Sequence, residues 1–394
     1  MKVNRDTGNA KHSHLSELPT PCLLIERSLL IKNIQRMSKH IKRLNCRLRP
    51  HVKTHKSLAI AKMIENEGPC SGITVSTIKE AEYFFNAGYT DILYAVGINA
   101  HKLDKVHALM KASCDIKLIL DSTEAAGQLI DYAQTHNVET PFKVYIELDV
   151  DAHRAGVKPD SEDLLTIASM LNDSRFTTLA GVMTHAGASY SCFGLEAQHK
   201  MAIQERDLSL LAARRIRHAG MPCPEVSIGS TPTALALDDA HGITEIRAGV
   251  YCVFDLVMSG LGVCAQGDIA ISVLGSIIGK QTDKDLALTD AGWMAMSRDR
   301  GTSEHPTDYG YGVVCDLHGK SLKNLTMVSA NQEHGIIGQQ STSTDGSFNP
   351  GNFAIGERVR ILPNHACSTM AQFEHFYLID KDRVIDKVPI LRGW

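Results

Sequence analysis

Lys53 is the first residue of the chain whose setting suggests covalent chemistry. It stands in a run with two histidines and a second lysine, Leu48-Arg49-Pro50-His51-Val52-Lys53-Thr54-His55-Lys56. Cationic neighbours and partial desolvation lower the pKa of a lysine and free its amine for Schiff-base chemistry. A solvated lysine at the end of a strand would give the same local sequence, so this segment alone leaves both interpretations open.

A second motif is suited to binding an anion. It reads Ser227-Ile228-Gly229-Ser230-Thr231-Pro232-Thr233. Gly229 lets the backbone approach a phosphate, the hydroxyls of Ser230 and Thr231 can donate to it, and proline suits the first turn of a helix. A capped helix start explains the serine and threonine equally well. The segment from Arg247 to Tyr251 follows the next apolar run and is expected on the same side.

A reactive lysine together with a phosphate cradle suggests pyridoxal phosphate. That cofactor needs an imine lysine, a phosphate site and a partner for its ring nitrogen. Arg154 could be the partner of the ring nitrogen, and His185 could stack on the ring. The alternatives are a structural arginine in a loop and a hydrogen-bonded core histidine.

A third motif, His365-Ala366-Cys367, could bind a metal ion. Residues at positions i and i+2 of a strand share one face, so a strand here would let both side chains reach the same ion. Imidazole plus thiolate favours zinc or another borderline-soft divalent ion. Two protein ligands would leave positions for water or substrate, which favours catalysis over a structural role. Coincidence is the alternative for so short a motif, and His334 could face the same site.

The elements that must position these residues follow a strand-then-helix rhythm. Predicted strands cover residues 48–53, 72–76, 91–96, 116–120, 142–150, 179–187, 225–230 and 245–253. Helical patterns lie between them, as at 122–136, where Ser122 is placed to cap the helix. Eight such units predict a (β/α)₈ barrel, whose active site forms at the C-terminal ends of the strands. An open doubly wound sheet is the alternative.

The rhythm changes after about residue 261, where short strands follow one another without long helices. We therefore predict an α/β protein: a (β/α)₈ TIM barrel plus a C-terminal β-rich domain. The predicted boundaries are 1–28 for an N-terminal tail and a strand joining the β domain, 29–260 for the barrel that binds the cofactor, and 261–394 for the β-rich domain with the metal site.

Composition excludes several classes of protein. The net charge of −3 over 394 residues leaves no basic footprint for nucleic acid. No stretch is long and apolar enough to span a membrane, and the polar start of the chain does not resemble a secretory signal. The ten scattered cysteines suit buried thiols in a reducing cytoplasm better than a disulfide framework.

Taken together, the motifs resemble those of the D-serine dehydratase and D-threonine aldolase family. The resemblance rests on four segments, residues 49–53, 229–233, 290–293 and 365–367, and covers the chain from about residue 20. Within the family, residues 290–302 and 331–336 are most similar to the branch of the D-threo-3-hydroxyaspartate dehydratases. The resemblance implies the alanine-racemase-like fold, pyridoxal phosphate, a divalent metal and a homodimer.

The resemblance also assigns roles to residues of this chain. It implies that Lys53 is the imine lysine, that His365 and Cys367 are metal ligands, and that Ser230, Thr231 and Tyr251 contact the phosphate. Zinc is the expected metal, with manganese, cobalt and magnesium as alternatives. The aldolase branch usually carries aspartate at the position of Cys367, which counts against an aldolase.

The expected reaction is therefore dehydration of a D-3-hydroxy amino acid, D-threo-3-hydroxyaspartate or D-serine, to a 2-oxo acid and ammonia. Lys53 is the expected catalytic residue, with Arg154, His185 and Gly229 at the cofactor. The alternatives are an aldolase acting on D-threonine or D-3-hydroxyaspartate, and a pyridoxal phosphate carrier without activity. The sequence does not choose among the possible substrates.

Overall fold

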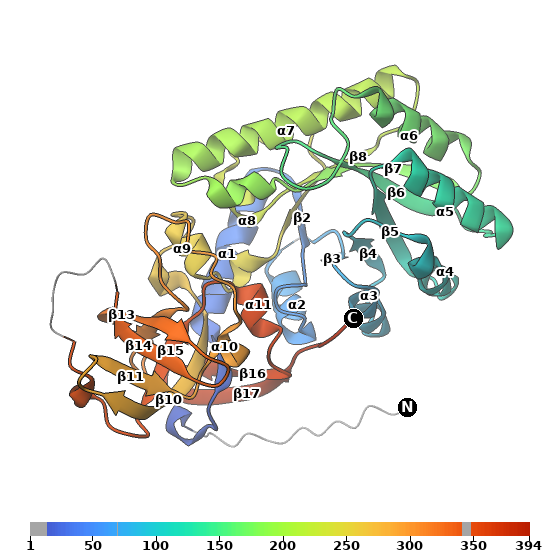
Figure 1. Cartoon of the computed structure of the whole chain (residues 1–394). Helices are drawn as coiled ribbons and strands as arrows, with labels where there is room; N and C mark the ends of the chain where they lie inside the picture. Colours follow the sequence, from blue (N-terminus) through green and yellow to red (C-terminus); the bar gives the residue numbers. More distant parts are fainter. Residues whose placement is uncertain (1–13, 69, 341–347) are drawn as a thin grey trace. The chain divides into compact units, whose positions relative to one another are not determined.

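A computed structural model describes residues 14–68, 70–340 and 348–394 (Figure 1). It divides into two compact units. The barrel unit comprises Ile34–Tyr251 with the last two residues of the chain. The β unit comprises the described residues up to Asn33 together with Cys252–Arg392.

The barrel unit contains the predicted parallel sheet of eight strands. The strands are β2 (Arg47–Pro50), β3 (Ile73–Val75), β4 (Asp91–Tyr94), β5 (Asp115–Leu120), β6 (Phe142–Leu148), β7 (Thr177–Thr184), β8 (Glu225–Ile228) and β9 (Glu245–Ala248). Strands β2 and β9 pair in parallel, and two further parallel bridges, Leu48–Cys70 and His51–Thr74, join β2 to the β3 side and close the ring. The predicted (β/α)₈ barrel is confirmed, and the open-sheet alternative is wrong.

The helices of this unit begin where the sequence provides caps, and they flank the sheet, as α5, α6 and α7 do in Figure 1. Thr77 accepts from the backbone N–H of Glu80, and Ser122 accepts from that of Ala125, which satisfies donors that the first helical turn leaves open. The helices are α1 (Arg27–Arg43), which runs from one unit into the other, α2 (Leu58–Glu67), α3 (Ile78–Asn86), α4 (Leu103–Lys111), α5 (Thr123–Thr135), α6 (Glu162–Asp173), α7 (Leu195–His218) and α8 (Thr231–Ala236).

Several strands end earlier than the sequence analysis predicted. Strand β2 ends at Pro50, and Lys53 lies beyond it in a turn that the bond from Lys56 N–H to Val52 C=O closes at 2.7 Å. Ser230 caps α8 instead of ending a strand, and Tyr251 lies in the short helix η4 (Val250–Cys252). The candidate residues therefore stand on the turns that follow the strands.

The named strands of the β unit pair antiparallel, except that β1 (Cys22–Glu26) pairs in parallel with β16 (His375–Asp380). The opposite edge of β1 pairs with β10 (Ile271–Gln281), so both ends of the chain contribute to this sheet. Strands β10, β11 (Leu286–Thr289), β14 (Gly335–Gln339), β13 (Ser321–Ala330), β12 (Val313–Cys315) and β15 (Arg358–Leu362) form a closed ring, and β17 (Arg383–Pro389) extends the sheet beyond β16. The described part of this unit also contains the short α-helices α9 (Leu256–Gly260), α10 (Trp293–Met296) and α11 (Ala366–Met370).

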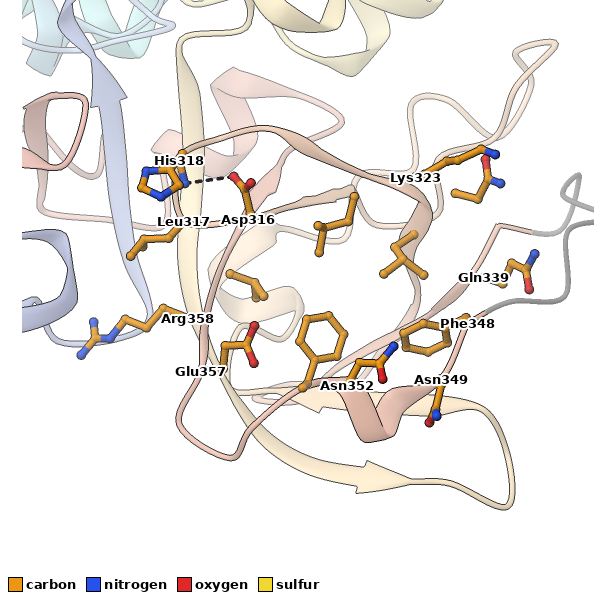
Figure 2. Close-up of a pocket in the computed structure, with 15 residues that line it drawn as sticks. Asp316, Leu317, His318, Lys323, Gln339, Phe348, Asn349, Asn352, Glu357 and Arg358 are labelled. Atoms are coloured by element: carbon orange, nitrogen blue, oxygen red, sulfur yellow. Dashed lines mark hydrogen bonds between the residues drawn. The ribbon is translucent and has the colours of Figure 1, made fainter.

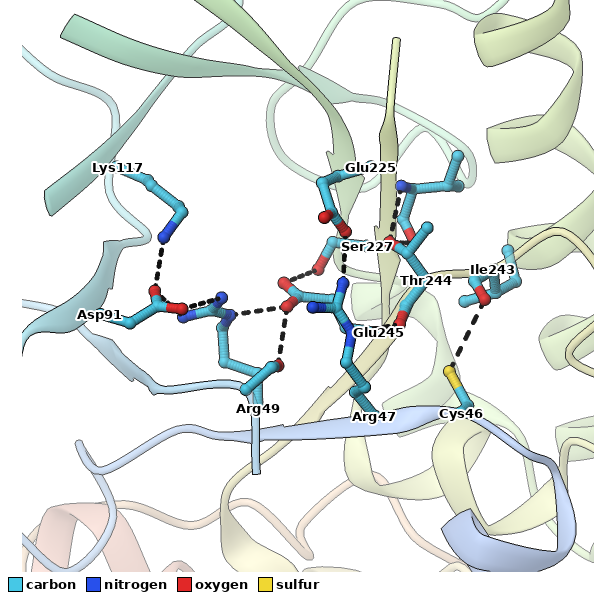
Figure 3. A network of polar contacts seen from close by, with 12 residues as sticks. Cys46, Arg47, Arg49, Asp91, Lys117, Glu225, Ser227, Ile243, Thr244 and Glu245 are labelled. Carbon is cyan, nitrogen blue, oxygen red and sulfur yellow. Dashed lines mark hydrogen bonds and ion pairs between the residues drawn. The ribbon is translucent and has the colours of Figure 1, made fainter. Parts of the chain in front are cut away.

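A buried ionic network lies inside the barrel towards the N-terminal ends of its strands (Figure 3). Arg49 Nε contacts Glu245 Oε2 at 2.8 Å, and Arg49 Nη1 contacts Asp91 Oδ1 at 2.8 Å. Lys117 also reaches Asp91, and Ser227 Oγ donates to Glu245 at 2.8 Å. Since this end of a TIM barrel contributes to stability and not to catalysis, the network is structural.

Replacing Arg49 with methionine is expected to lower the free energy of unfolding of the barrel by about 3–5 kcal/mol, because Glu245 would keep a buried, unpaired charge. Arg47→Met provides the matched control. Arg47 pairs with Glu225 at 2.6 Å, but its side chain is 48% exposed, so its loss should cost less than about 1 kcal/mol. Urea unfolding followed by circular dichroism measures both variants. Equal losses for the two would contradict the role given to the buried network.

Candidate active site

Lys53 is exposed in the turn after β2. Other residues of the chain therefore do not desolvate its amine, contrary to the prediction. The nearby Lys56 differs, because its Nζ lies 3.4 Å from Glu80, a fully buried carboxylate. Glu80 also accepts from the backbone N–H of Ser76 at 2.7 Å. Lys56 is thus held in a structural ion pair, whereas the exposed Lys53 has no ion-pair partner in the part of the chain described.

His51 and His185 lie close enough to Lys53 for its positive charge to change their pKa values. Burial and the positive charge of Lys53 lower the pKa of His185 to about 3. The same two causes lower the pKa of His51 well below its ordinary value. His185 Nδ1 lies 3.1 Å from the carbonyl oxygen of Gly229, so Nδ1 carries the proton and donates. Both rings are therefore neutral near pH 7.

The predicted anion cradle follows β8. Gly229 has φ +129°, and a Cβ there would lie 2.2 Å from the carbonyl oxygen of Arg247, so only glycine fits. Ser230 Oγ contacts Ser189 Oγ at 2.8 Å and Thr233 Oγ1 at 3.0 Å. Thr231 Oγ1 is buried and has no hydrogen-bond partner among the described residues. An unsatisfied buried hydroxyl beside a glycine of this shape is suited to an oxygen-rich ligand.

The sequence analysis missed Glu205, which supports this cradle from α7. Its Oε1 accepts from the backbone N–H groups of Ala186 at 3.0 Å and Gly229 at 3.1 Å. It thereby ties together the segments that follow β7 and β8, and burial raises its pKa. Nothing in the sequence marked a glutamate of a long amphipathic helix as buried, so the contact could be found only in the structure.

Two arginines of the barrel differ in their burial and in their contacts. Arg154, the predicted partner of the ring nitrogen, is exposed, and its Nη2 lies 3.8 Å from Glu147 Oε1 on β6. Arg247 on β9 was named only as part of a motif, yet it is buried, with Nε 2.8 Å from Ser227 Oγ and Nη2 bonded to the carbonyl oxygen of Thr184. Its charge acts on both His51 and His185. Its place at the C-terminal part of a barrel strand was the signal that could have singled it out.

In the β unit, the prediction that His365 and Cys367 lie on a strand is wrong. Strand β15 ends at Leu362, His365 is the N-cap of α11, and Cys367 lies inside that helix. A helix starts here because the chain turns in the loop before His365. At the start of this helix, Asp255 Oδ2 accepts a hydrogen bond from the backbone N–H of Ala366 (2.9 Å). The two side chains nevertheless meet through a hydrogen bond.

His365 also contacts an aspartate that the sequence analysis overlooked. Its Nδ1 lies 2.6 Å from Asp299 Oδ2. Burial alone would lower the pKa of His365, but the hydrogen bonds to Asp299 and Cys367 outweigh it and raise the pKa to about 11. Among the described residues, no group of three or more histidine, cysteine or acidic side chains could hold a metal ion. His334 is exposed in the turn between β13 and β14.

A cavity of about 600 Å³ in the β unit contains none of the residues predicted for the site (Figure 2). Its apolar lining includes Phe348 and Phe353. The polar groups at its rim are engaged locally, since His318 Nδ1 lies 2.9 Å from Asp382 and Asn349 Oδ1 accepts from Gly351 N–H. The cavity therefore shares no lining residue with the candidate active site.

Two family models match the chain. Residues 25–256 match the alanine racemase N-terminal domain, and residues 270–379 match the serine dehydratase domain.

The cysteines of the chain are thiols. Within the described residues, no helix is long and apolar enough to cross a membrane.

Among known proteins, D-threo-3-hydroxyaspartate dehydratase from Delftia sp. strain HT23 is 47% identical over 96% of this chain and 99% of that enzyme. Its solved structure superimposes with a TM-score of 0.92, covering 97% of this chain and 100% of the other. Solved variants of a D-threo-3-hydroxyaspartate dehydratase also match, one with a histidine-to-alanine substitution and one with a cysteine-to-alanine substitution two positions later, the latter in a metal-free form.

Two more distant relatives match over most of their length. D-serine dehydratase from Dictyostelium discoideum is 29% identical over 96% of this chain and 97% of that enzyme. A 3-hydroxy-D-aspartate aldolase from Paracoccus denitrificans is 25% identical over 92% of this chain and 89% of that enzyme. The greater similarity is to the dehydratases.

Proposed function

Because this chain belongs to the family that joins an alanine-racemase-type barrel to a serine dehydratase domain, we propose that it converts D-threo-3-hydroxyaspartate to oxaloacetate and ammonia with the help of a divalent metal. At the coarser level it is a pyridoxal-phosphate-dependent lyase that dehydrates D-3-hydroxy amino acids. The observation that carries the metal-assisted proposal is the contact between His365 and Cys367.

The barrel residues fit pyridoxal phosphate. The unsatisfied hydroxyl of Thr231 and the constrained Gly229 suit a phosphate, and Ser230 and Tyr251 are proposed to contact it as well. When bound, pyridoxal phosphate supplies an electron sink for the electron pair left at the substrate Cα.

Lys53 is proposed to hold the cofactor and then to take the Cα proton at Nζ. The neutral His185 is proposed to lie against the cofactor ring, where its Nδ1–H bond to Gly229 fixes its orientation. Arg154 remains the proposed partner of the ring nitrogen, and the buried Arg247 is a second candidate, because it is already fixed by Ser227. Mutation of each arginine separately would decide between them.

The donor set of the β unit fits a borderline-soft ion. His365 and Cys367 would hold it, and Asp299 Oδ2 lies 2.6 Å from His365 Nδ1. When bound, a divalent ion supplies a Lewis acid for the hydroxide that leaves Cβ. We propose zinc, with manganese, cobalt or magnesium as alternatives. The homodimer and the cytoplasmic location are proposals as well, supported by the family resemblance and by the thiol cysteines.

The test of this function is a panel of D-threo-3-hydroxyaspartate, D-serine and D-threonine, each with and without added zinc. We expect ammonia and the 2-oxo acid in equal amounts, fastest with D-threo-3-hydroxyaspartate and dependent on metal. Glycine or an aldehyde as the main product would support the aldolase alternative instead. Lack of turnover with every substrate would support a cofactor carrier.

Replacing Thr231 with valine tests the phosphate cradle. The change keeps the shape of the side chain and removes the hydroxyl that has no partner in the described chain. Loss of one charge-assisted hydrogen bond should cost about 1.5–3 kcal/mol, or roughly 10- to 150-fold in the cofactor dissociation constant. Spectrophotometric titration of the apoenzyme with pyridoxal phosphate measures this.

Thr177→Val is the matched control for that titration. Thr177 Oγ1 donates to the carbonyl oxygen of Leu171 at 2.6 Å, at the start of β7 and far along the strand from its C-terminal end. This variant should bind the cofactor as the unmodified protein does. If Thr231→Val also binds it normally, the cradle lies elsewhere.

A further inference from the structure

We propose that Asp299 is the positioning residue of the metal site: it holds the proton on Nδ1 of His365 and so reserves Nε2 for the metal. The inference rests on the metal-dependent function proposed above. Asp299 Oδ2 lies 2.6 Å from Nδ1, and an ionised carboxylate can only accept. Nδ1 is therefore the donor, which leaves Nε2 as the ring nitrogen for the ion. Partners of this kind orient metal-binding histidines and raise their basicity.

Asp299 is itself fixed relative to the helix that carries the ligands. Its backbone N–H donates to Ser297 Oγ at 3.1 Å, and Ser297 Oγ in turn donates to Ser368 Oγ at 3.0 Å. Its carbonyl oxygen accepts from Asn364 Nδ2 at 3.3 Å. Ser368 and Asn364 flank the ligand pair in sequence, so the turn that presents Asp299 is tied to both sides of it.

Asp308, a second carboxylate in the loop that contains Asp299, forms an ordinary ion pair and provides a comparison. Asp308 Oδ2 lies 2.6 Å from Arg300 Nη2, with both side chains about as accessible as those of Asp299 and His365. Exposed and half-exposed pairs of this kind contribute little to stability. If Asp299 served only in such a pair, its loss would resemble the loss of Asp308. The proposal predicts that the two differ in metal affinity.

The experiment compares Asp299→Asn with Asp308→Asn in the cofactor-loaded full-length protein. Zinc dissociation constants are measured by competition with a chromophoric chelator, and His365→Ala defines the site. We expect Asp299→Asn to bind zinc about 10- to 100-fold more weakly. Asp308→Asn should change the constant by less than about twofold, as expected for a surface pair. The absorbance of the bound cofactor should be the same in both variants.

A measurement on the unmodified protein does not depend on how the variants fold. The protein is produced with isotope-labelled histidine, loaded with an NMR-active cadmium isotope, and assigned with His365→Gln. Coupling of cadmium to Nε2 of His365 supports the proposal, and coupling to Nδ1 overturns it. Normal zinc affinity in Asp299→Asn also overturns it. An unmodified protein that binds no zinc would instead contradict the metal-dependent function itself.

Discussion

Lys53→Ala is expected to lose the absorbance of the protein-bound imine and to lower turnover by more than about 10³-fold, because the variant lacks both the cofactor linkage and the proposed base. Pyridoxal phosphate should still bind, more weakly, through the cradle of Gly229 and Thr231. Absorbance spectra, steady-state rates and borohydride reduction followed by peptide mapping measure these effects. In the unmodified protein the reduced cofactor should be found on Lys53.

The control is Lys56→Ala, three residues along the same turn. Lys56 pairs with the buried Glu80, so the variant should lose stability and keep the imine. A reduced cofactor found on Lys56, or a Lys53→Ala enzyme with its imine absorbance intact, would show that the lysine has been wrongly assigned.

Removal of the metal should have the second largest effect. A chelator is expected to abolish dehydration and to leave the cofactor bound to Lys53, because the two groups use different residues, and zinc should restore activity. Cys367→Ala should sharply weaken metal binding, since it removes the thiolate ligand. Cys192→Ala is the control, because Cys192 is also partly exposed but lies in the barrel unit, with its Sγ 3.5 Å from the carbonyl oxygen of Ala188. Full activity with metal shown absent by elemental analysis would refute the proposed role.

Cys367→Asp refines this test. Aspartate keeps a negative ligand but makes the site harder, which favours manganese or magnesium over zinc. Dehydration should then fall more than metal binding does, because a harder, more hydrated ion is expected to be a weaker Lewis acid towards hydroxide. Because the family resemblance implies aspartate at this position in the aldolase branch, we expect some aldehyde beside the remaining 2-oxo acid. Product analysis by chromatography distinguishes the two reactions.

The barrel could be predicted from the sequence because its strands are short, buried and separated by capped helices, a local pattern that repeats. The β-rich second unit was predicted from the loss of that pattern. What the sequence could not show is which distant side chains meet. Glu205 bonds to Gly229 and Asp299 bonds to His365 across long stretches of chain, and nothing in their local sequence marks them as partners.

His365 and Cys367 illustrate how a correct juxtaposition can follow from a wrong local structure. The prediction that His365 and Cys367 lie together assumed a strand, but the chain forms a helix start there. An N-cap residue stands outside the helix, so its side chain can turn towards the first helical turn. Short polar motifs of this kind fit either backbone, and only the preceding turn decides between them.

The pairing of β1 with β10 and β16 has a consequence for how the protein is made. Lys381 N–H donates to Glu26 Oε1 across 355 residues of sequence. At about 5–20 residues per second, the ribosome needs roughly 20–70 s to produce that span. In the first part of this interval, before β10 (Ile271–Gln281) is synthesised, β1 has left the ribosome with neither neighbour available, while the whole of Ile34–Tyr251 can already collapse. The apolar Leu23, Leu24 and Ile25 are then an unpaired strand until β10 is made, and the edge of β1 that pairs with β16 stays open to other chains until translation is nearly complete.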